Sequence, residues 1–443
     1  MGSVQPARST GDKPRRRHRL IALMAVLVLI VAACSDDGSS DTTGGTGDTT
    51  APDGEPVEIT LWFNGETVPP DEFASLEAEH NIRVNYDIRG DDILTFSLQM
   101  RDAGETLPDL VEIDSHLTPA FIEAELAQPM DEWVELWEEE DPELFATVHP
   151  EVWETGTVDG SIMHAPVKAG YDLIYYNVAM LEEAGVEPDW ETWTDVLEAA
   201  RAVKAAIPDL GEYFGTGGTS HDRMFYWLTN FGVPFEGNVP DLTDPQGIAM
   251  ITWLQALGNE ALVNPGYMIG EQDESQGAFQ REDLAILQEG ANGGISFMEN
   301  EDFTYGEDGW LTTAMPVEGG EQMSVPRGWT LMSETEHPAE AMLALRYLME
   351  PENAIPRFTE LLSSPIRSTA VLDSPEVEEL MPYFTQDIRD VFSGISRQIP
   401  LGTNTNAVGD ILLDLLDELT VVTTTESPEA LAEKYQAQLD ELG

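Results

Sequence analysis

Short apolar segments with two different periods alternate along the chain after residue 56. Val57, Ile59 and Leu61 alternate with other residues, which predicts a strand with one buried face. Strands and helices then follow in turn, at residues 57–63, 71–79, 82–88, 91–103 and 109–114, with a further helix opened by Thr118 and Pro119. This order is typical of a parallel sheet covered by helices on both faces, so we predict an α/β fold.

The alternation resumes after an acidic helical region. Further strands are predicted at 162–166, 173–176, 294–298, 313–317 and 329–332. Helices are predicted at 178–184 and 193–207, from Asp244 onward, and towards the C-terminus at 338–348, 376–391, 408–420 and 428–442. The length of residues 57–443 suggests two or three compact units.

The first 33 residues have a different pattern. A basic cluster from Lys13 to Arg19 runs into the uncharged apolar stretch from Leu20 to Ala33, which is typical of a secretory signal. The stretch has 14 residues, whereas a helix that crosses a bilayer needs about 20. The arginine pair at 16–17 leaves twin-arginine export open as an alternative to the general secretory route.

Cys34 is the only cysteine, and the preceding Val31-Ala32-Ala33 resembles the lipobox of bacterial lipoproteins. The resemblance implies that residues 1–33 are removed as a lipoprotein signal peptide and that Cys34 is acylated, which anchors the chain to a membrane without spanning it. Residues 34–56 are too polar to bury a core and are expected to form a disordered tether. We therefore expect a lipid-anchored protein on the extracellular face of the cell membrane.

The charge is strongly acidic, with 21 Lys and Arg against 83 Asp and Glu. Residues 1–33 hold six of the basic residues and one of the acidic ones, so the rest of the chain has 15 against 82. This balance excludes nucleic acid as a partner and argues against binding to an anionic membrane surface. It favours a highly soluble or salt-adapted surface over a site for cationic ligands.

Several short fragments occur in an order that is found in one protein family. They are Ile59–Phe63 with Ile82–Val84, Ala103-Gly104 with Leu107–Leu110, Ala165-Pro166, Leu173–Asn177 with Glu183–Gly185 and Trp193, Gly294–Met298, and Pro365–Ser368. In this order they resemble the extracellular solute-binding proteins of ABC importers, in particular the carbohydrate-binding branch that includes maltose-binding protein.

The resemblance implies a two-lobed type II periplasmic-binding-protein fold. Each lobe would be a mostly parallel sheet flanked by helices, with the ligand cleft at the hinge, at 57–166 plus about 298–348 for lobe 1 and at 167–297 plus about 349–443 for lobe 2. The implied function is capture of a mono- or oligosaccharide and its delivery to the permease subunits of an ABC importer. A monomer without cofactor or metal is expected.

Ligand contacts are expected in the loops after strand ends, because open α/β sheets bind ligands there. The candidates, which match ligand positions of the family or lie in such loops, are Asn64, Glu66, Ser115, His116, Lys168, Tyr171, Ser220, Asp222, Glu299, Asn300, Trp329 and Asn404. Tyr171 and Trp329 would be stacking rings, and Lys168 would donate to sugar hydroxyls. Structural roles stay open: Glu66 could lie in a solvated turn.

One departure from the family pattern and two rival functions remain to be weighed. Maltose-type relatives carry a Trp after the return crossing where this chain has Glu299 and Asn300, which favours a short or polar ligand over a long glucan. A polyamine or other cation on the same fold is one alternative. A surface-anchored glycosidase is the other, although the sequence has no Gly-x-Ser-x-Gly elbow, zinc helix or P-loop, and we predict no enzymatic activity.

Overall fold

The computed structural model describes residues 55–65, 68–69, 71–90, 92–217, 221–264, 272–361, 366–395, 397–398, 402 and 404–442. All of them belong to the compact unit Thr50–Gly443. The predicted signal peptide, Cys34 and nearly all of the tether lie outside the described residues. Within the described residues, no helix is long and apolar enough to cross a membrane.

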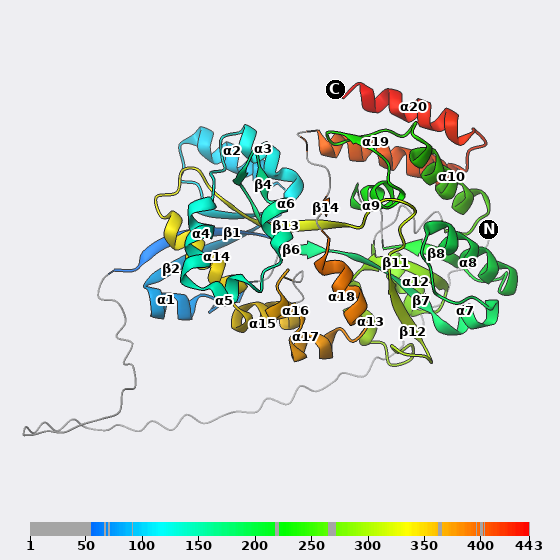
Figure 1. The fold of residues 1–443 in the computed structure, drawn as a ribbon, viewed down its shortest axis with the longest axis horizontal. Helices are drawn as coiled ribbons and strands as arrows, with labels where there is room; N and C mark the ends of the chain where they lie inside the picture. The colour runs from blue at the N-terminus through cyan, green and yellow to red at the C-terminus, as the bar shows by residue number, and fades with distance from the viewer. Residues whose placement is uncertain are drawn as a thin grey trace, which may run out of the picture. The chain divides into compact units, whose positions relative to one another are not determined.

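The first sheet is built around β1 and has the strand order β14-β13-β3-β1-β2, with β6 paired to β13 (Figure 1). Its strands are β1 (Val57–Asn64), β2 (Ile82–Arg89), β3 (Leu110–Asp114), β6 (Ala165–Gly170), β13 (Met323–Leu331) and β14 (Arg397–Gln398). β1 is parallel to β2 and β3, and β13 is antiparallel to β3 and β6. The predicted opening order of strands and helices is thus confirmed.

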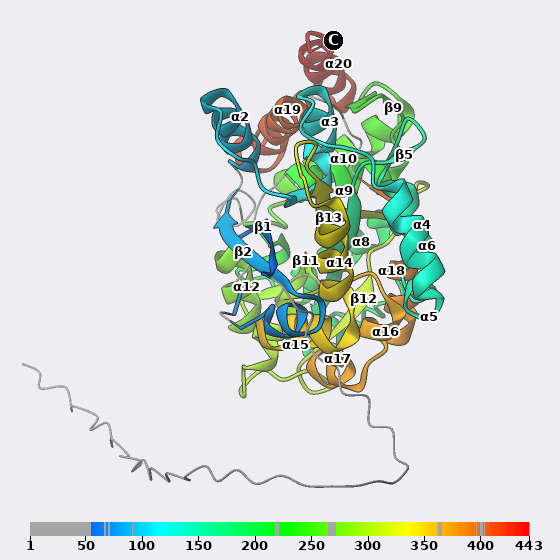
Figure 2. The same ribbon diagram turned by 90° about the vertical axis from the view of Figure 1, so that its left-hand side faces the viewer.

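Helices connect and cover these strands. They are α1 (Ala74–His80), α2 (Ile93–Ala103), α3 (Thr118–Glu123), α4 (Asp131–Glu140), α5 (Pro142–Phe145), α6 (Pro150–Thr155) and α14 (Pro338–Met349). α2 ends as predicted at Gly104, which is left-handed (φ 70°) and returns its N–H to the last turn. Figure 2 shows α4, α5 and α6 along one side, where the Trp137 and Trp153 rings lie 5.9 Å apart.

The second sheet has the order β12-β7-β11-β8. Its strands are β7 (Asp172–Asn177), β8 (Glu212–Thr216), β11 (Leu284–Gly290) and β12 (Trp310–Ala314), and the helices around it include α7 (Val178–Ala184), α8 (Trp193–Ala206), α9 (His221–Phe231), α10 (Pro245–Asn259), α12 (Gln272–Gln280), α19 (Thr405–Asp417) and α20 (Pro428–Asp440). β8 and β11 are parallel, whereas β7 is antiparallel to β11 and β12. α8 begins at a capping box between Thr192 and Asp195.

Two chain segments join the sheets, and they pair with each other. β6 and β13 form an antiparallel ribbon in which Val325 faces Gly170 and Arg327 faces Lys168 (Figure 1). We call this pair of strands the crossing ribbon. Along β6, Val167 packs in the core under the first sheet and Ala169 in the core under the second. The crossing ribbon therefore runs from one core to the other.

The pairing within the crossing ribbon requires a glycine. The register shifts between Arg327 and Trp329, which marks a bulge. A Cβ atom on Gly328 would lie 1.8 Å from the carbonyl oxygen of Ala165. Any other residue at position 328 would push the two strands apart.

Two sequence predictions about local structure were wrong. The predicted strand 294–298 is the helix α13 (Gly293–Met298), and the strand is the preceding β11. Ile295 and Phe297 are buried while Ser296 and Met298 are exposed. Burial in this short helix therefore alternates from residue to residue, as it does in a strand. The predicted helix 376–391 is divided into α17 (Pro375–Leu380) and α18 (Gln386–Ser393), because Pro382 interrupts it.

The remaining elements lie at the edges and near the C-terminus. They are the short strands β4 (Thr157–Val158), β5 (Ser161–Ile162), β9 (Phe235–Glu236) and β10 (Val239–Pro240), the helices α15 (Pro351–Leu361) and α16 (Thr369–Leu372), the 3-10 turn Ser115–Leu117 and the π-helical turn Glu418–Val422.

Candidate functional site

A polar cluster lies where β1, β3 and β13 meet at one edge of the first sheet. Asp114 ends β3 and accepts a hydrogen bond from Arg327 Nε (2.8 Å), its neighbour across the strand pair. Asn64 ends β1, and its Nδ2 donates to the second oxygen of Asp114 (3.4 Å). About a third of the Arg327 side chain and a fifth of the Asp114 side chain are exposed, whereas Asn64 is buried beneath them. We call these three residues the first polar cluster.

A buried ion pair lies behind the first polar cluster. Lys168 Nζ, on the crossing ribbon, is 2.6 Å from Glu112 Oε1, and the two side chains are 4% and 0% exposed. The other oxygen of Glu112 accepts the backbone N–H of Asn64 (3.0 Å). The pair thus ties the crossing ribbon to β3 and to the end of β1.

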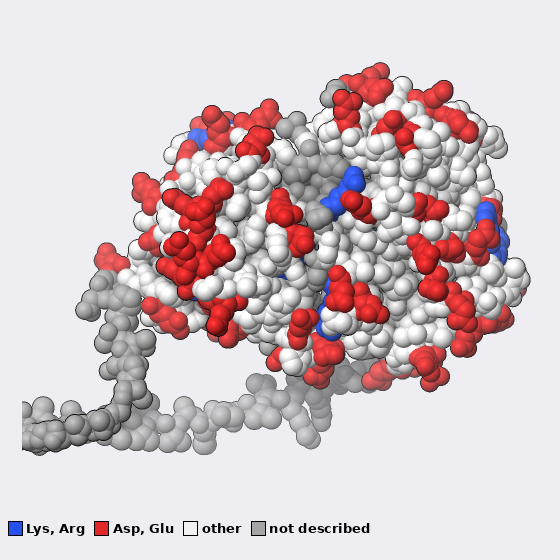
Figure 3. Space-filling view, viewed as in Figure 1, with Lys and Arg blue, Asp and Glu red and all other residues white. Residues whose placement is uncertain are grey.

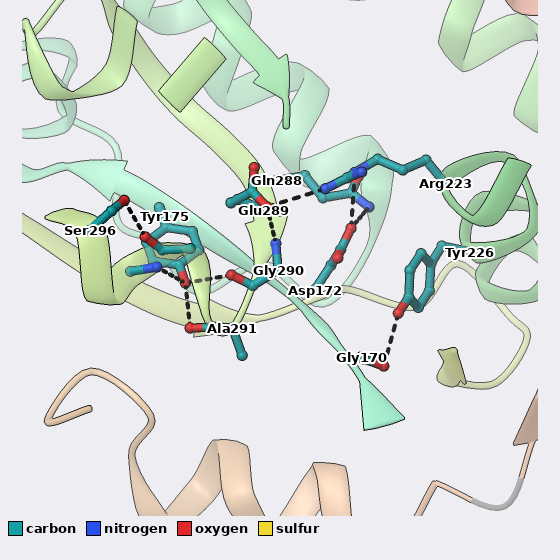
Figure 4. A network of polar contacts seen from close by, with 12 residues as sticks. Gly170, Asp172, Tyr175, Arg223, Tyr226, Gln288, Glu289, Gly290, Ala291 and Ser296 are labelled. Carbon is teal, nitrogen blue, oxygen red and sulfur yellow. Dashed lines mark hydrogen bonds and ion pairs between the residues drawn. The ribbon is translucent and has the colours of Figure 1, made fainter. Parts of the chain in front are cut away.

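A second polar cluster lies at one edge of the second sheet (Figure 4). Arg223, in the first turn of α9, is 3.1 Å from Asp172 Oδ2 at the start of β7 and 3.4 Å from Glu289 Oε1 near the end of β11. Gln288 Nε2 also donates to Asp172 (2.9 Å). Asp172, Arg223 and Glu289 are the second polar cluster.

The chain packs tightly around the second polar cluster at two neighbouring positions. Gly217 follows β8, and a Cβ atom there would lie 1.4 Å from Glu289 Oε2. Trp227, one turn after Arg223, donates from Nε1 to Gln288 Oε1 (2.9 Å) and fixes α9 against β11. Asp172 follows the last residue of β6 by two positions, and Arg327 lies on β13. Each polar cluster therefore includes a residue on or next to the crossing ribbon.

Among the predicted ligand residues, several lie at these strand ends but are buried. Ser115 and His116 form the 3-10 turn after β3, and Ser115 is buried. Tyr171 follows the crossing ribbon, and burial raises the pKa of its hydroxyl. Lys168 is buried in its ion pair with Glu112, so its ammonium stabilises this edge of the sheet.

Trp329 and two asparagines have structural contacts. The Trp329 ring is 1% exposed and packs edge-on against Phe63 at 4.8 Å, so it is not available as the predicted stacking platform. Asn300 accepts from two backbone N–H groups in its own loop, and Asn404 accepts from Asn238 Nδ2 (2.8 Å). Glu299 is exposed at the end of α13. Both rings predicted to stack on a ligand, Tyr171 and Trp329, are therefore buried, and β13 turns Trp329 into the core.

Three predicted positions lie outside what is described. Glu66 and Ser220 are outside the described residues, and so is the side chain of Asp222. The sequence reasoning missed Asp114, Arg327, Asp172, Arg223 and Glu289 as a connected set. The available signal was position: Asp114, Asp172 and Glu289 lie at or next to strand ends, and Arg223 is in the first turn of α9. Arg327 gave no such signal, because it lies at the middle of β13 and meets Asp114 only through strand pairing.

The sequence also did not predict a pair of cation–π contacts at the end of β2, which we call the cation stack. The Arg89 guanidinium lies 4.7 Å from the Trp62 ring and 5.2 Å from the Phe96 ring. Gly65 N–H donates to the carbonyl of Arg89 (2.7 Å), so the stack borders the end of β1. Phe96 is exposed, and an exposed ring held by a cation is a surface on which a sugar face can stack.

A separate groove does not involve either polar cluster. It has a volume of about 890 Å³ and lies between the β9–β10 hairpin and α20. Its charged lining side chains are Glu236, Asp241 and Asp440. Acidic residues cover much of this protein, so their presence here does not distinguish the groove (Figure 3). Among the described residues, no group of three His, Cys, Asp or Glu side chains is placed to hold a metal ion.

The acidic surface predicts a salt dependence. Figure 3 shows Asp and Glu spread over the drawn face with few Lys or Arg. The formal net charge is −62, so like charges repel in the folded state. Because the screening length falls from about 10 Å at 0.1 M salt to about 3 Å at 1 M, we expect the melting temperature to rise by roughly 5 °C over this range.

Calorimetry in sodium and potassium chloride tests this prediction. The two salts should act alike at equal ionic strength, since screening does not depend on the identity of the ion. A melting temperature that stays constant or falls with salt would mean that repulsion does not limit stability.

Comparison with known proteins adds to this geometry. Residues 68–355 match the sequence family described as bacterial extracellular solute-binding protein. The arabinooligosaccharide-binding protein of Bacillus subtilis (strain 168) is 23% identical over 278 residues, which are 59% of this chain and 59% of that protein. The chain thus matches less than two thirds of the length of this relative.

Solved structures share the fold over most of the chain. Maltose-bound MalE3 of T. maritima has a TM-score of 0.66 at 18% identity, over 87% of this chain and 100% of that one. The sugar-binding protein MalE of Xanthomonas citri has a TM-score of 0.70 at 16% identity, over 87% and 97%. The cyclic alpha-maltosyl-1,6-maltose binding protein of Arthrobacter globiformis has a TM-score of 0.66 at 17% identity, over 88% and 100%. The predicted two-lobed α/β fold is confirmed.

Proposed function

Because the chain belongs to the family of bacterial extracellular solute-binding proteins, we propose that it captures a mono- or oligosaccharide and delivers it to the permease of an ABC importer. The observation that carries the proposal is the pair of polar clusters, one on each sheet, joined by the crossing ribbon. A solute held by both clusters would draw the two lobes together, and its binding energy would favour the closed form.

The chemistry of the polar clusters suits a neutral ligand with hydroxyl groups. Carboxylates accept and guanidinium groups donate, and a sugar hydroxyl can do both. Arg327 remains partly exposed beside Asp114, whereas the side chains of Arg223 and Asp172 are only 10% and 8% exposed. Similar proteins are described as binding arabino-oligosaccharide, maltose and cyclic maltosyl-maltose, which supports a sugar here.

The same residues argue against the cationic alternative. Arg89 ends β2, Arg327 faces the last residue of β3, and Arg223 lies beside the first residue of β7. Each guanidinium group is paired with a carboxylate and so offsets part of the negative charge that would attract a polyamine. We also propose that the protein binds without turnover, since the family and its structural neighbours are binding proteins rather than enzymes.

We propose limits for the two lobes from the sheet to which each strand belongs. β12 belongs to the second sheet and β13 to the first, so the return crossing would lie between Ala314 and Met323 instead of near 298. We further propose that Cys34 carries the lipid anchor, that the tether keeps a monomeric binder near its permease on the extracellular face, and that no cofactor takes part.

A binding screen tests the proposed function. We expect a saturable rise in melting temperature with at least one neutral mono- or oligosaccharide, short arabino-oligosaccharides included, and no rise with spermidine. Asp114→Asn should weaken sugar binding about 10- to 100-fold, because hydrogen bonds to a charged partner contribute about 1.5–3 kcal/mol. Isothermal titration measures both effects.

Asp283→Asn is the matched control. Asp283 pairs with Arg281 at 3.2 Å, as Asp114 pairs with Arg327, but both side chains are mostly exposed on the surface. Sugar affinity should stay within about twofold in this variant. Steady release of reducing ends, or a shift with spermidine alone, would contradict the proposal.

A further inference from the structure

Helix α9 contacts the first chain crossing at two points (Figure 4). Tyr226 Oη donates to the carbonyl oxygen of Gly170, the last residue of β6 (3.1 Å). Arg223, one turn earlier, pairs with Asp172 at 3.1 Å. Both contacts lie where the chain leaves the crossing ribbon and enters the second sheet.

The C-terminal end of α9 holds the second crossing. The carbonyl of Asn230 accepts the N–H groups of Glu318 (2.9 Å) and Gly320 (3.1 Å), and that of Thr229 accepts the N–H of Glu321 (3.1 Å). Asn230 Nδ2 donates to the carbonyl of Pro316 (3.3 Å). The loop between β12 and β13 is therefore fastened to the last turn of α9.

The contact between α9 and the loop that joins β12 to β13 depends on a close approach of the two backbones. A Cβ atom on Gly320 would lie 1.8 Å from the carbonyl oxygen of Thr229. Gly232, just past the helix, has a φ of +79°, which favours glycine. These positions let the loop lie directly on the backbone of α9.

α9 itself is fixed within the second lobe. Its buried hydrophobic residues, which are all in the core under the second sheet, are Met224, Phe225, Tyr226, Trp227, Leu228 and Phe231. Trp227 Nε1 is bonded to Gln288 of β11 at 2.9 Å. Whatever α9 holds must therefore move with the second lobe.

From these contacts we infer that α9 fastens both chain crossings on the second-lobe side and thereby confines lobe movement to the crossing ribbon itself. The inference rests on the lobe movement of the proposed function. Bending is then limited to the stretch between Val167 and Gly170 on β6 and to the stretch after Glu321 on the return. Tyr226 is a positioning residue: it does not need to touch the solute to set the hinge.

The arrangement also links the solute to the hinge. Arg223 belongs to the second polar cluster, and it lies on the same helix as Tyr226. A solute contact that shifts Arg223 would therefore act on both crossings at once, through one rigid helix. The two crossings are also joined by their pairing in the crossing ribbon.

The distance distribution between the lobes tests this without any sugar. Spin labels are placed at Glu138→Cys on α4 and Glu183→Cys on α7, two exposed sites, in the chain carrying Cys34→Ser so that no other thiol is present. Tyr226→Phe keeps the ring and removes the hydroxyl, and Gly320→Ala pushes the return loop from α9. In each variant, the distribution of distances between the two spin labels should be roughly 1.5-fold wider, as measured by double electron–electron resonance.

Two controls separate hinge control from general loosening. Tyr213→Phe removes a comparable bond, from Tyr213 Oη to the carbonyl of Pro208 (2.9 Å), away from the crossings. Gly90→Ala adds a Cβ that meets no atom within 4 Å. Both should keep the width of the unaltered protein. Unchanged widths in Tyr226→Phe and Gly320→Ala, or equal widening in the controls, would overturn the inference.

The outcome is independent of the solute. If no sugar binds in the screen but Tyr226→Phe still widens the distribution, the proposed function fails and the role of α9 stands. If sugar binds and the widths do not change, the role of α9 fails alone. A melting curve followed by circular dichroism shows that each variant is folded before the distances between its spin labels are measured.

Discussion

Lys168→Met is expected to lower the free energy of unfolding by about 3–5 kcal/mol, because it leaves Glu112 as a buried charge without its partner. The Lys168 ammonium and the Glu112 carboxylate are 2.6 Å apart, and neither side chain is more than 4% exposed. The change keeps an unbranched chain of similar volume, so packing is largely retained. Chemical denaturation measures the loss.

The matched comparison is another Lys–Glu pair, on the surface. Lys434 lies 2.5 Å from Glu418, but 43% of its side chain is exposed. Lys434→Met should therefore reduce stability by less than about 1 kcal/mol. The double variant Lys168→Met, Glu112→Gln should recover part of the loss, since no charge then remains buried. Equal losses in Lys168→Met and Lys434→Met would show that burial of the pair does not matter.

Local features of the fold were readable from the sequence. Alternation at Val57, Ile59 and Leu61 gave β1, and the glycine at 104 marked the end of α2. Such features depend on neighbours within a few residues, and local sterics and hydrogen bonding decide them. The family resemblance, which rested on the order of several such features, is confirmed by the match over residues 68–355.

The site was harder to predict because its contacts join residues far apart in sequence. Asp114 meets Arg327, and Asp172 meets Arg223, only after both sheets have formed. Trp329 follows a glycine near a strand end, where an aromatic ring can point either way, and the register of β13 turns it into the core. A shift of one residue in that register would have placed the ring on the opposite face.

Acidification should destabilise the protein through His164, and burial also lowers the pKa of a second histidine, His149. His164 is 1% exposed, its Nδ1 is 3.0 Å from Thr330 Oγ1, and burial lowers the pKa of its imidazole from 6.5 to about 3. Between these values the unfolded chain binds a proton that the folded protein does not. This contribution to stability is complete above pH 6.5 and is lost as the pH falls towards 3, with a slope of up to about 1.4 kcal/mol per pH unit.

The window from pH 6.5 to 5 isolates this effect. Below about pH 5 the many carboxylates begin to protonate, and the relief of their repulsion acts in the opposite direction. Within the window the unaltered protein should lose about 2 kcal/mol more than His164→Gln, which cannot take up the proton. Denaturation at several pH values measures the slopes. His80→Gln, at an exposed position at the end of α1, removes an imidazole without touching the core. If His164→Gln and the unaltered protein lost stability in parallel, the proton would have to bind elsewhere. The buried His164 ring would then not govern the acid limit of the fold.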